Sequence, residues 1–319
     1  MPLCPVCGKK SQQLGMLCQC SKAYTIHEDQ PKDPLNLLGK QILNKLVPVG
    51  IYSIGKSTVS YEAWQTSLER MTTLIVMKPE VAAVESQKER FLTSVNKFSV
   101  IHQQNLPMLF EELEITDLKT FALLCDVSRG EKLADYLVTT KPDDVILIHI
   151  IHQLIQGMAA YHRYSVCVPN LGYNQVLICR TGGDSSFVKF TGIIDAILST
   201  PEKDVSPTDD VWCLGQLALS ILTGQTIPIT NVELTEERAY LMSIIQLFMR
   251  ATAPFEERYK TANELLIDFE TLLDVHPKAP VKSVASLAWG DASHKEKPIR
   301  NSVEMKQILW MHRPPFVEE

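Results

Sequence analysis

The hydrophobic pattern of this chain of 319 residues changes character near residue 125, and that change limits the folds open to it. Between residues 46 and 74, short pieces rich in Val, Ile, Thr and Tyr are separated by Gly50 and Gly55, which is typical of strands joined by turns. One helical stretch at 87–101 and two more strand-like pieces follow. Beyond residue 125 the apolar residues recur at helical spacing. Strands first and helices afterwards predict an α+β protein of two lobes.

Helix signals in the second half of the chain support this division. Residues 143–164 place apolar side chains on one broad face. Ser206 and Gly224 are the residue types that begin and end a helix. Residues 261–264 read TANE, a capping box that opens another helix. The large lobe is therefore expected to be mostly helical.

Four of the eight cysteines lie in the first twenty residues: Cys4, Cys7, Cys18 and Cys20. Four thiolates at this spacing favour a closed structural zinc site, because zinc prefers four sulfur ligands arranged as a tetrahedron. The second pair is Cys-x-Cys, which departs from the usual Cys-x-x-Cys spacing. Two redox-active pairs, or surface thiols without a ligand, are the alternatives. The segment resembles half of a zinc ribbon and is too short to fold without its metal.

These patterns give a division of the whole chain. We expect a zinc-binding module over 1–26, a polar linker over 27–45, a small lobe over 46–125, a large lobe over 126–275 and a tail over 276–319. Charge and hydropathy then exclude some classes of function. Thirty-one basic against thirty-seven acidic side chains give a net charge of −6, which argues against nucleic acid as a partner. No apolar run is long enough to insert into a membrane, and no secretory signal opens the chain, so a cytoplasmic protein is expected.

Several motifs in register resemble those of bacterial Ser/Thr protein kinases. Residues 209–215 read DDVWCLG, which is similar to the start of the central buried helix of that family. Residues 200–202 (TPE) resemble the A-P-E motif, and residues 255–262 (FEERYKTA) resemble the segment that follows the central helix. In the small lobe, residues 75–80 (IVMKPE) and 105–107 (NLP) match two further family segments. The resemblance implies a two-lobed kinase-like fold over residues 46–275.

The resemblance also implies structural roles for three residues. Glu202 and Arg258 stand where the family has a buried ion pair, and Asp210 stands where the family anchors the backbone of the catalytic loop. All three residue types are retained, so the scaffold of the fold is expected to be intact.

In contrast to these structural residues, most residues needed for phosphoryl transfer are altered. Gly55 is the one glycine retained of the three in the phosphate loop, since Ser53 and Thr58 occupy the other positions. The strand lysine has two registers: one keeps Lys78, and the other, which we prefer because it also matches Pro79 and Glu80, places Ile75 there. Gly55 and Lys78 are thus the remaining candidates for nucleotide binding.

The other catalytic positions are also altered. The helix glutamate aligns with Ser94, and Asn170 replaces the aspartate that accepts the proton, which a neutral amide cannot do. Gln175 replaces a metal-binding asparagine, and Gly192 stands where the magnesium-binding aspartate belongs. Asp195, three residues further on, needs a register shift to serve. We therefore expect a pseudokinase, not an enzyme, that uses neither ATP nor magnesium.

Such a protein is expected to act as a scaffold that contacts another protein. The alternatives are an atypical ATP-using transferase that employs Lys78, Asp126 or Asp195, and a nucleotide-binding sensor without turnover. The tail adds a second open question, because residues 303–312 are compatible with a short amphipathic helix. That helix either packs on its own large lobe or binds a partner.

Overall fold

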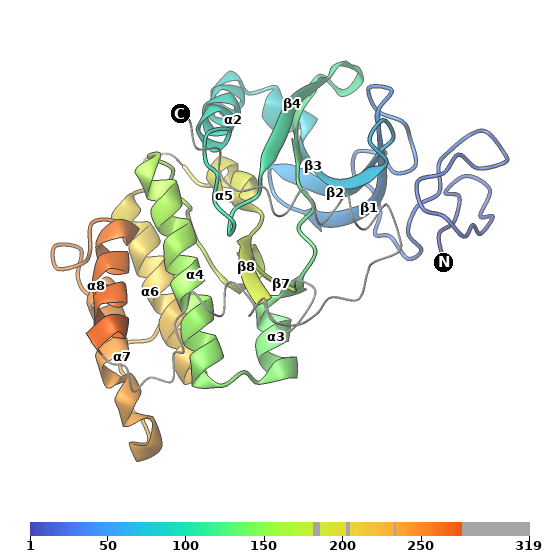
Figure 1. Ribbon diagram of the computed structural model, residues 1–319. Helices are drawn as coiled ribbons and strands as arrows, with labels where there is room; N and C mark the ends of the chain where they lie inside the picture. The colour runs from blue at the N-terminus through green and yellow to red at the C-terminus, as the bar shows by residue number, and fades with distance from the viewer. Residues whose placement is uncertain (181–185, 202–204, 233, 276–319) are drawn as a thin grey trace, which may run out of the picture. The chain divides into compact units, whose positions relative to one another are not determined.

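The computed structural model describes residues 1–180, 186–201, 205–232 and 234–275 (Figure 1). Two of the predictions fall outside these ranges: Glu202, and the whole tail with its helix at 303–312. Within the described residues, no helix is long and apolar enough to cross a membrane.

The small lobe is built on one antiparallel sheet of five strands in the order β1-β2-β3-β5-β4. The strands are β1 (Leu46–Ile54), β2 (Thr58–Gln65), β3 (Arg70–Met77), β4 (Leu109–Ile115) and β5 (Thr120–Cys125). Buried and half-exposed residues alternate along most of β3 and the second half of β2, which is the period of two of a strand with one buried face. This sheet is the upper half of the ribbon in Figure 1.

Two helices follow β3 and flank the sheet: α1 (Pro79–Ala82) and α2 (Glu85–Phe98). Proline is favoured in the first turn of a helix, where its missing amide hydrogen costs nothing, and Pro79 occupies that position in α1. Helix α2 buries Phe91 and Val95 in a cluster that also contains Leu123 of β5 and Ile194 of the large lobe. The cluster joins the sheet, α2 and the segment after β8, so the two lobes share part of one apolar core.

Residues 27–45 contribute to the core of the small lobe. Leu37 and Ile42 are buried in the cluster that contains Val59 and Leu74 of the sheet. The Asp33 carboxylate accepts hydrogen bonds from the amides of residues 35, 37 and 38 and, at 2.6 Å, from the Tyr61 hydroxyl. A segment that looks like a linker in sequence thus packs against the sheet, because one carboxylate satisfies several of its backbone donors.

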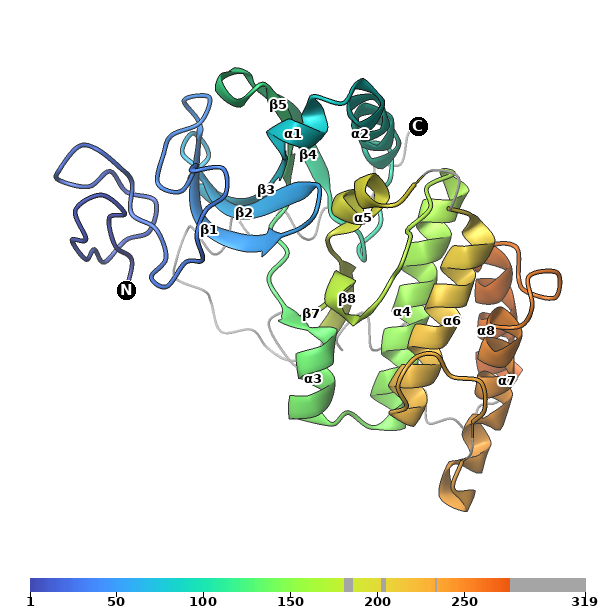
Figure 2. The same ribbon diagram turned by 180° about the vertical axis from the view of Figure 1, so that it is seen from behind.

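The large lobe is mostly helical. Its elements are β6 (Glu131–Lys132), α3 (Leu133–Thr140), α4 (Asp144–Arg163), η2 (Tyr173–Gln175), β7 (Val176–Arg180), β8 (Ser186–Phe190), α5 (Ile193–Ser199), α6 (Pro207–Thr223), η4 (Glu236–Leu241), α7 (Met242–Ala251) and α8 (Ala262–Val275). Helices α4, α6 and α8 pack side by side, with α7 against α6 and α8 (Figures 1 and 2). The predicted caps are present, since Ser206 accepts from the amide of Asp209 and Gly224 ends α6 with a φ of 72°. The predicted α+β class with two lobes is confirmed.

A buried polar chain connects the small-lobe segment before β4 with α4. The Gln153 side-chain oxygen accepts from Asn105 Nδ2 at 2.9 Å and from the amide of Val188 at 2.8 Å. Because that oxygen is the acceptor, Gln153 Nε2 must donate, and it lies 2.7 Å from His149 Nε2. His149 Nε2 is therefore unprotonated, and its proton sits on Nδ1, which is buried without a partner among the described residues. The ring is neutral in the folded protein.

We predict that this neutral ring makes the protein sensitive to mild acid. Burial lowers the pKa of His149 below its ordinary value of 6.5, with the nearby His152 adding to the effect. The unfolded chain takes up the proton near pH 6.5 while the folded chain does not, so stability falls as pH drops below 6.5. The slope due to this group is at most about 1.4 kcal/mol per pH unit. In urea unfolding between pH 7.5 and 5.5, His149→Gln should flatten the profile; the exposed His102→Gln should not. Parallel profiles for wild type and His149→Gln would contradict this assignment.

Candidate functional site

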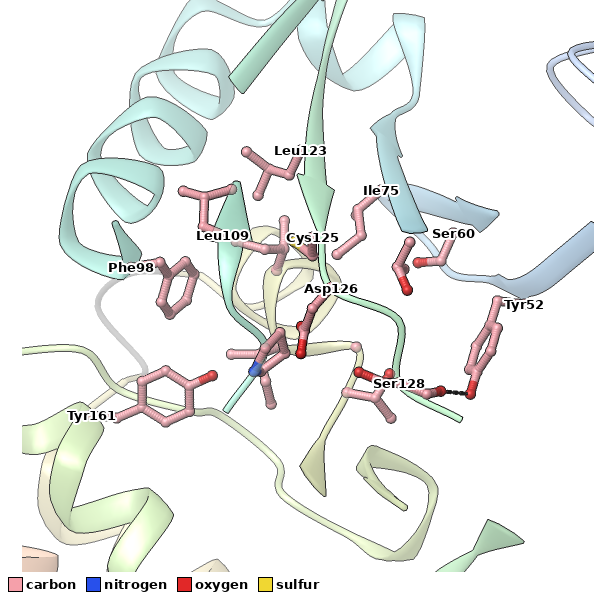
Figure 3. A pocket seen from close by; sticks show the side chains of 16 residues that line it. Tyr52, Ser60, Ile75, Phe98, Leu109, Leu123, Cys125, Asp126, Ser128 and Tyr161 are labelled. Atoms are coloured by element: carbon pink, nitrogen blue, oxygen red, sulfur yellow. Dashed lines mark hydrogen bonds between the residues drawn. The ribbon is translucent and has the colours of Figure 1, made fainter. Parts of the chain in front are cut away.

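A cleft lies where the sheet meets the large lobe (Figure 3). Its walls come from β1–β3, the end of α2, the segment around β4, the end of β5, α4 and the segment after β8. The lining residues are Tyr52, Ser60, Thr73, Ile75, Phe98, Pro107, Leu109, Leu123, Cys125, Asp126, Ser128, Tyr161, Thr191, Gly192, Ile193 and Ile194. Most of these side chains are apolar, and Asp126 is the one with a formal charge.

The charge of Asp126 is neutralised inside the protein. Lys189 of β8 forms an ion pair with it, and the Lys189 side chain is 7% exposed. The other oxygen of Asp126 accepts from the amide of Met108 at 2.8 Å. At the same edge, the Tyr52 hydroxyl donates to the Ser128 carbonyl, so β1 is tied to the segment that connects the lobes (Figure 3). Burial raises the pKa of Tyr52 to about 12, so this donor stays protonated at neutral pH.

Two further groups in the cleft are also uncharged. Burial raises the pKa of the Cys125 thiol to about 12, and the neighbouring Asp126 adds to the effect, so the thiol is a poor nucleophile. Tyr161 is almost fully buried, and its hydroxyl points into the cleft (Figure 3). Burial raises the pKa of Tyr161 as well.

The structure separates the two candidates for the strand lysine. Ile75 lies on the wall of the cleft with Thr73, two residues before it on the same face of β3. Lys78 lies beyond the end of β3, at the N-cap of α1, and is not one of the lining residues. Its amide donates to the Ser57 carbonyl at 2.9 Å, so the backbone of Lys78 contributes to the turn rather than to the cleft.

Three of the predicted altered positions come together where Gly192 lines the cleft. Gln175 Nε2 donates to the Asn170 carbonyl at 3.0 Å, and Gln175 Oε1 accepts from the amide of Gly172 at 2.9 Å. Asn170 has a φ of 57°, in the left-handed region that asparagine tolerates, and its side chain donates to Thr200 at 3.3 Å. Gly192, with a φ of 68°, lies beside Gln175. Within this group the side chains are amides and a hydroxyl, which bind through hydrogen bonds and carry no charge.

The predicted anchor, Asp210, is 1% exposed on α6. Its carboxylate accepts from the amide of Val168 at 2.6 Å and from His162 Nε2 at 3.1 Å. Burial raises the pKa of Asp210, while His162 and the Val168 amide oppose that rise. Arg258 is the predicted partner of Glu202, which lies outside the described residues. Among those that are described, Arg258 contacts Asp209 at 3.5 Å and donates to the Ala253 carbonyl.

Gly55 lies in the turn between β1 and β2, and this turn contacts α5. The amides of Ser57 and Thr58 donate to Asp195 Oδ1 at 2.7 and 2.8 Å. The amide of Lys56 donates to Asp195 Oδ2 at 3.3 Å. The sequence alone gave no reason to pair Asp195 with this turn, because 137 residues or more separate the partners.

Helix α2 holds the other side of α5. Arg90, one turn before the predicted position Ser94, donates to the carbonyls of Ile197 at 2.7 Å and Thr200 at 2.9 Å. These two carbonyls belong to the C-terminal end of α5, where backbone acceptors have no partner within the helix. Sequence reasoning identified neither Arg90 nor Lys189 as a site residue. The signal it lacked is spatial, since each pairs with a group from a distant part of the chain.

The four N-terminal cysteines converge as predicted. Their Sγ atoms all lie within 4.8 Å of one another, with Cys4–Cys20 at 3.7 Å and Cys7–Cys18 at 3.6 Å. A tetrahedral zinc ion with bonds of about 2.3 Å needs sulfur atoms about 3.8 Å apart, so the cluster fits that ion. Burial opposes ionisation of Cys4, but the backbone amides of Cys7 and Val6 donate to its sulfur and lower its pKa to about 7. The cluster could thus hold a metal ion.

Solved structures share this fold. The kinase domain of PknI from Mycobacterium tuberculosis superposes with a TM-score of 0.58 at 14% sequence identity, over 73% of this chain and 98% of that one. The apo form of PpkA-294 gives a TM-score of 0.59 at 15% identity, over 73% of this chain and 98% of that one. No protein-family model matches the chain, and no curated protein matches it either. The kinase-like fold inferred from the motifs is therefore confirmed.

These matches correct one expectation. The prediction that the chain is not an enzyme is contradicted, because structures that share its fold are kinase domains. Nothing in the described residues is a positive sign of a non-enzyme. At Ile75, Asn170 and Gly192 the residue types differ from those that the kinase resemblance implies, but such differences do not exclude a reaction.

We predict that the cysteine cluster binds one zinc ion per chain. In the purified full-length protein, elemental analysis should give one zinc ion, and a chelator should remove it and unfold the N-terminal module while the large lobe stays folded. Cys7→Ser should abolish stoichiometric zinc, because three thiolates cannot complete the site. Cys213→Ser, which changes a thiol in α6, is the matched control and should retain the ion. Full zinc content in Cys7→Ser would show that the cluster is not the binding site.

Proposed function

We propose that this chain is a regulatory protein of the kinase fold that acts by holding another protein. On this proposal, the two lobes form a platform for the partner, and the metal module extends that platform at its N-terminal end. The partner is a protein, and the complex forms in the cytoplasm.

The observation that carries the proposal is the charge of the cleft. The phosphates of a nucleoside triphosphate need cationic groups around them. Asp126 is the one charged side chain on the cleft wall, it is negative, and Lys189 is already paired with it. Ile75, which the preferred one of the two registers aligns with the family's lysine, lies on the wall of the cleft. A cleft of this kind offers no cationic group to a bound triphosphate. We therefore base the proposed role on contacts that the surface of the protein makes with a partner.

The metal module supplies a suitable contact surface. Val6 lies between two of the ligand cysteines and is 57% exposed, and Leu17 precedes a third and is 54% exposed. Apolar side chains held rigidly by a metal lose little conformational entropy when a partner covers them. We include this surface in the proposed contact for that reason.

The proposal predicts a partner whose capture depends on the module. Tagged full-length chain, expressed in its native cell and crosslinked, should enrich one protein. The double variant Val6→Ser/Leu17→Ser should reduce its recovery about tenfold, which corresponds to roughly 1.4 kcal/mol. Leu68→Ser, which changes an equally exposed leucine in the small lobe (59% exposed), should leave recovery unchanged. Failure to recover any stable partner would contradict the proposal, whereas equal recovery with the double variant would exclude only the module as the contact.

A second candidate, an atypical ATP-using transferase, is favoured by the kinase domains among the structural matches and by the Asp126–Lys189 pair. Here Asp126 would be the one carboxylate in the cleft able to accept a proton. The prediction is transfer of label from γ-labelled ATP that Asp126→Asn abolishes and that Lys78→Ala, outside the cleft, leaves intact. Absence of transfer with the wild-type protein, over a panel of protein and small-molecule acceptors, would rule this candidate out.

A further inference from the structure

The turn between β1 and β2 surrounds an internal anion. Three consecutive amides, those of Lys56, Ser57 and Thr58, point at the carboxylate of Asp195, and the Thr58 hydroxyl donates to it at 3.2 Å. Successive backbone N–H groups that converge in this way form a concave site for an anion. Hydrogen bonds to a charged acceptor are stronger than those between neutral groups. The turn is therefore already occupied by a ligand that belongs to the same chain.

Gly55 allows the carboxylate to come this close. A Cβ atom placed on Gly55 would lie 2.2 Å from the carboxyl carbon of Asp195, a distance that no side chain tolerates. Glycine is needed here because there is no room for a Cβ atom, and not because of a left-handed backbone conformation. The retained glycine of the turn fits an internal carboxylate as well as it would fit an external phosphate.

Helix α5, which carries Asp195, is also held by contacts that do not involve the carboxylate. Ser199, at the last position of α5, contacts Ser57 with 3.0 Å between the two hydroxyl oxygens. Arg90 of α2 binds two carbonyls at the end of the same helix. Helix α5 is therefore fixed at its first turn by the β1–β2 turn and at its last turn by α2. Figure 2 shows α5 directly below α2 and beside strands β1–β3 of the sheet.

We propose that Asp195 is an intramolecular latch, which occupies the anion site of the β1–β2 turn and excludes phosphoanions from it. In the latched state α5 joins the two lobes. An incoming polyphosphate competes with the Asp195 carboxylate for the same amides, so it binds only when α5 moves away. The latch and the ligand-bound turn are mutually exclusive states.

This inference is independent of the proposed partner-binding role, because it concerns the turn and α5 and needs no second protein. The proposed latch also predicts a change in the affinity of the turn for a phosphoanion. A ligand that must displace an internal competitor binds more weakly by the fraction of time that the site is free. Removal of the competitor should therefore strengthen binding at the turn without any new contact.

The experiment compares tripolyphosphate binding by the full-length chain and two Asp195 variants, using calorimetric titration. Asp195→Ala removes the competing carboxylate and should bind tripolyphosphate at least tenfold more tightly than wild type, with Asp195→Asn between the two. Asp117→Asn, which removes an exposed carboxylate of the small lobe, is matched in charge and should bind like wild type. Equal affinity in wild type and a folded Asp195→Ala would overturn the proposal.

Amide hydrogen exchange gives a second readout that needs no ligand. The amides of Ser57 and Thr58 should exchange slowly in wild type and at least tenfold faster in Asp195→Ala. If Asp195→Ala does not fold, Gly55→Ala keeps the carboxylate but forces it away from the turn, and it should accelerate the same two amides. Unchanged exchange at Ser57 and Thr58 in the folded variant would show that Asp195 does not hold the turn.

Discussion

The carboxylate of Asp210 is buried at the point where three helices and a loop of the large lobe meet. It accepts from the Val168 amide and from His162, whose other ring nitrogen accepts from the amide of Ala262 at the start of α8. These bonds fix the histidine tautomer, with its hydrogen on Nε2. They also fix α4, α6 and α8 relative to the loop that carries Asn170. A buried carboxylate without these partners would cost several kcal/mol, so the packing of the lobe depends on this one arrangement.

The cleft and the turn above it satisfy their charges internally. Lys189 neutralises Asp126, Asp195 fills the β1–β2 turn, and Arg90 binds the free carbonyls of α5. Each pair joins residues far apart in the sequence and removes a charged or polar group from solvent. In the cleft and in the turn, these polar groups are bonded to one another. In the latch that we propose, these bonds couple the position of α5 to the occupancy of the β1–β2 turn.

The elements that sequence patterns located best are those with strong local signals. Helices α4 and α6 have caps and long apolar faces, and the structure places them within one residue of the predicted starts. Helix α5 gave no such signal, because seven residues are too few to be stable alone and it forms only against α2 and the turn. Residues 27–45 look like a linker in sequence because they show no helix or strand period. Their backbone is held by hydrogen bonds from several amides to the Asp33 carboxylate, and such bonds leave no periodic pattern.

The sequence by itself determined the α+β layout, the cysteine cluster and the identity of the residues at the positions that the kinase resemblance singles out. Hydrophobic period, helix caps and short-range thiol spacing are local properties, so they can be read along the chain. Only the tertiary structure decided which charges meet. The pairing of Asp195 with the β1–β2 turn spans about 140 residues, and Lys189 with Asp126 spans 63. Such pairs depend on how the lobes pack, and packing energy is a property of the whole core rather than of any segment.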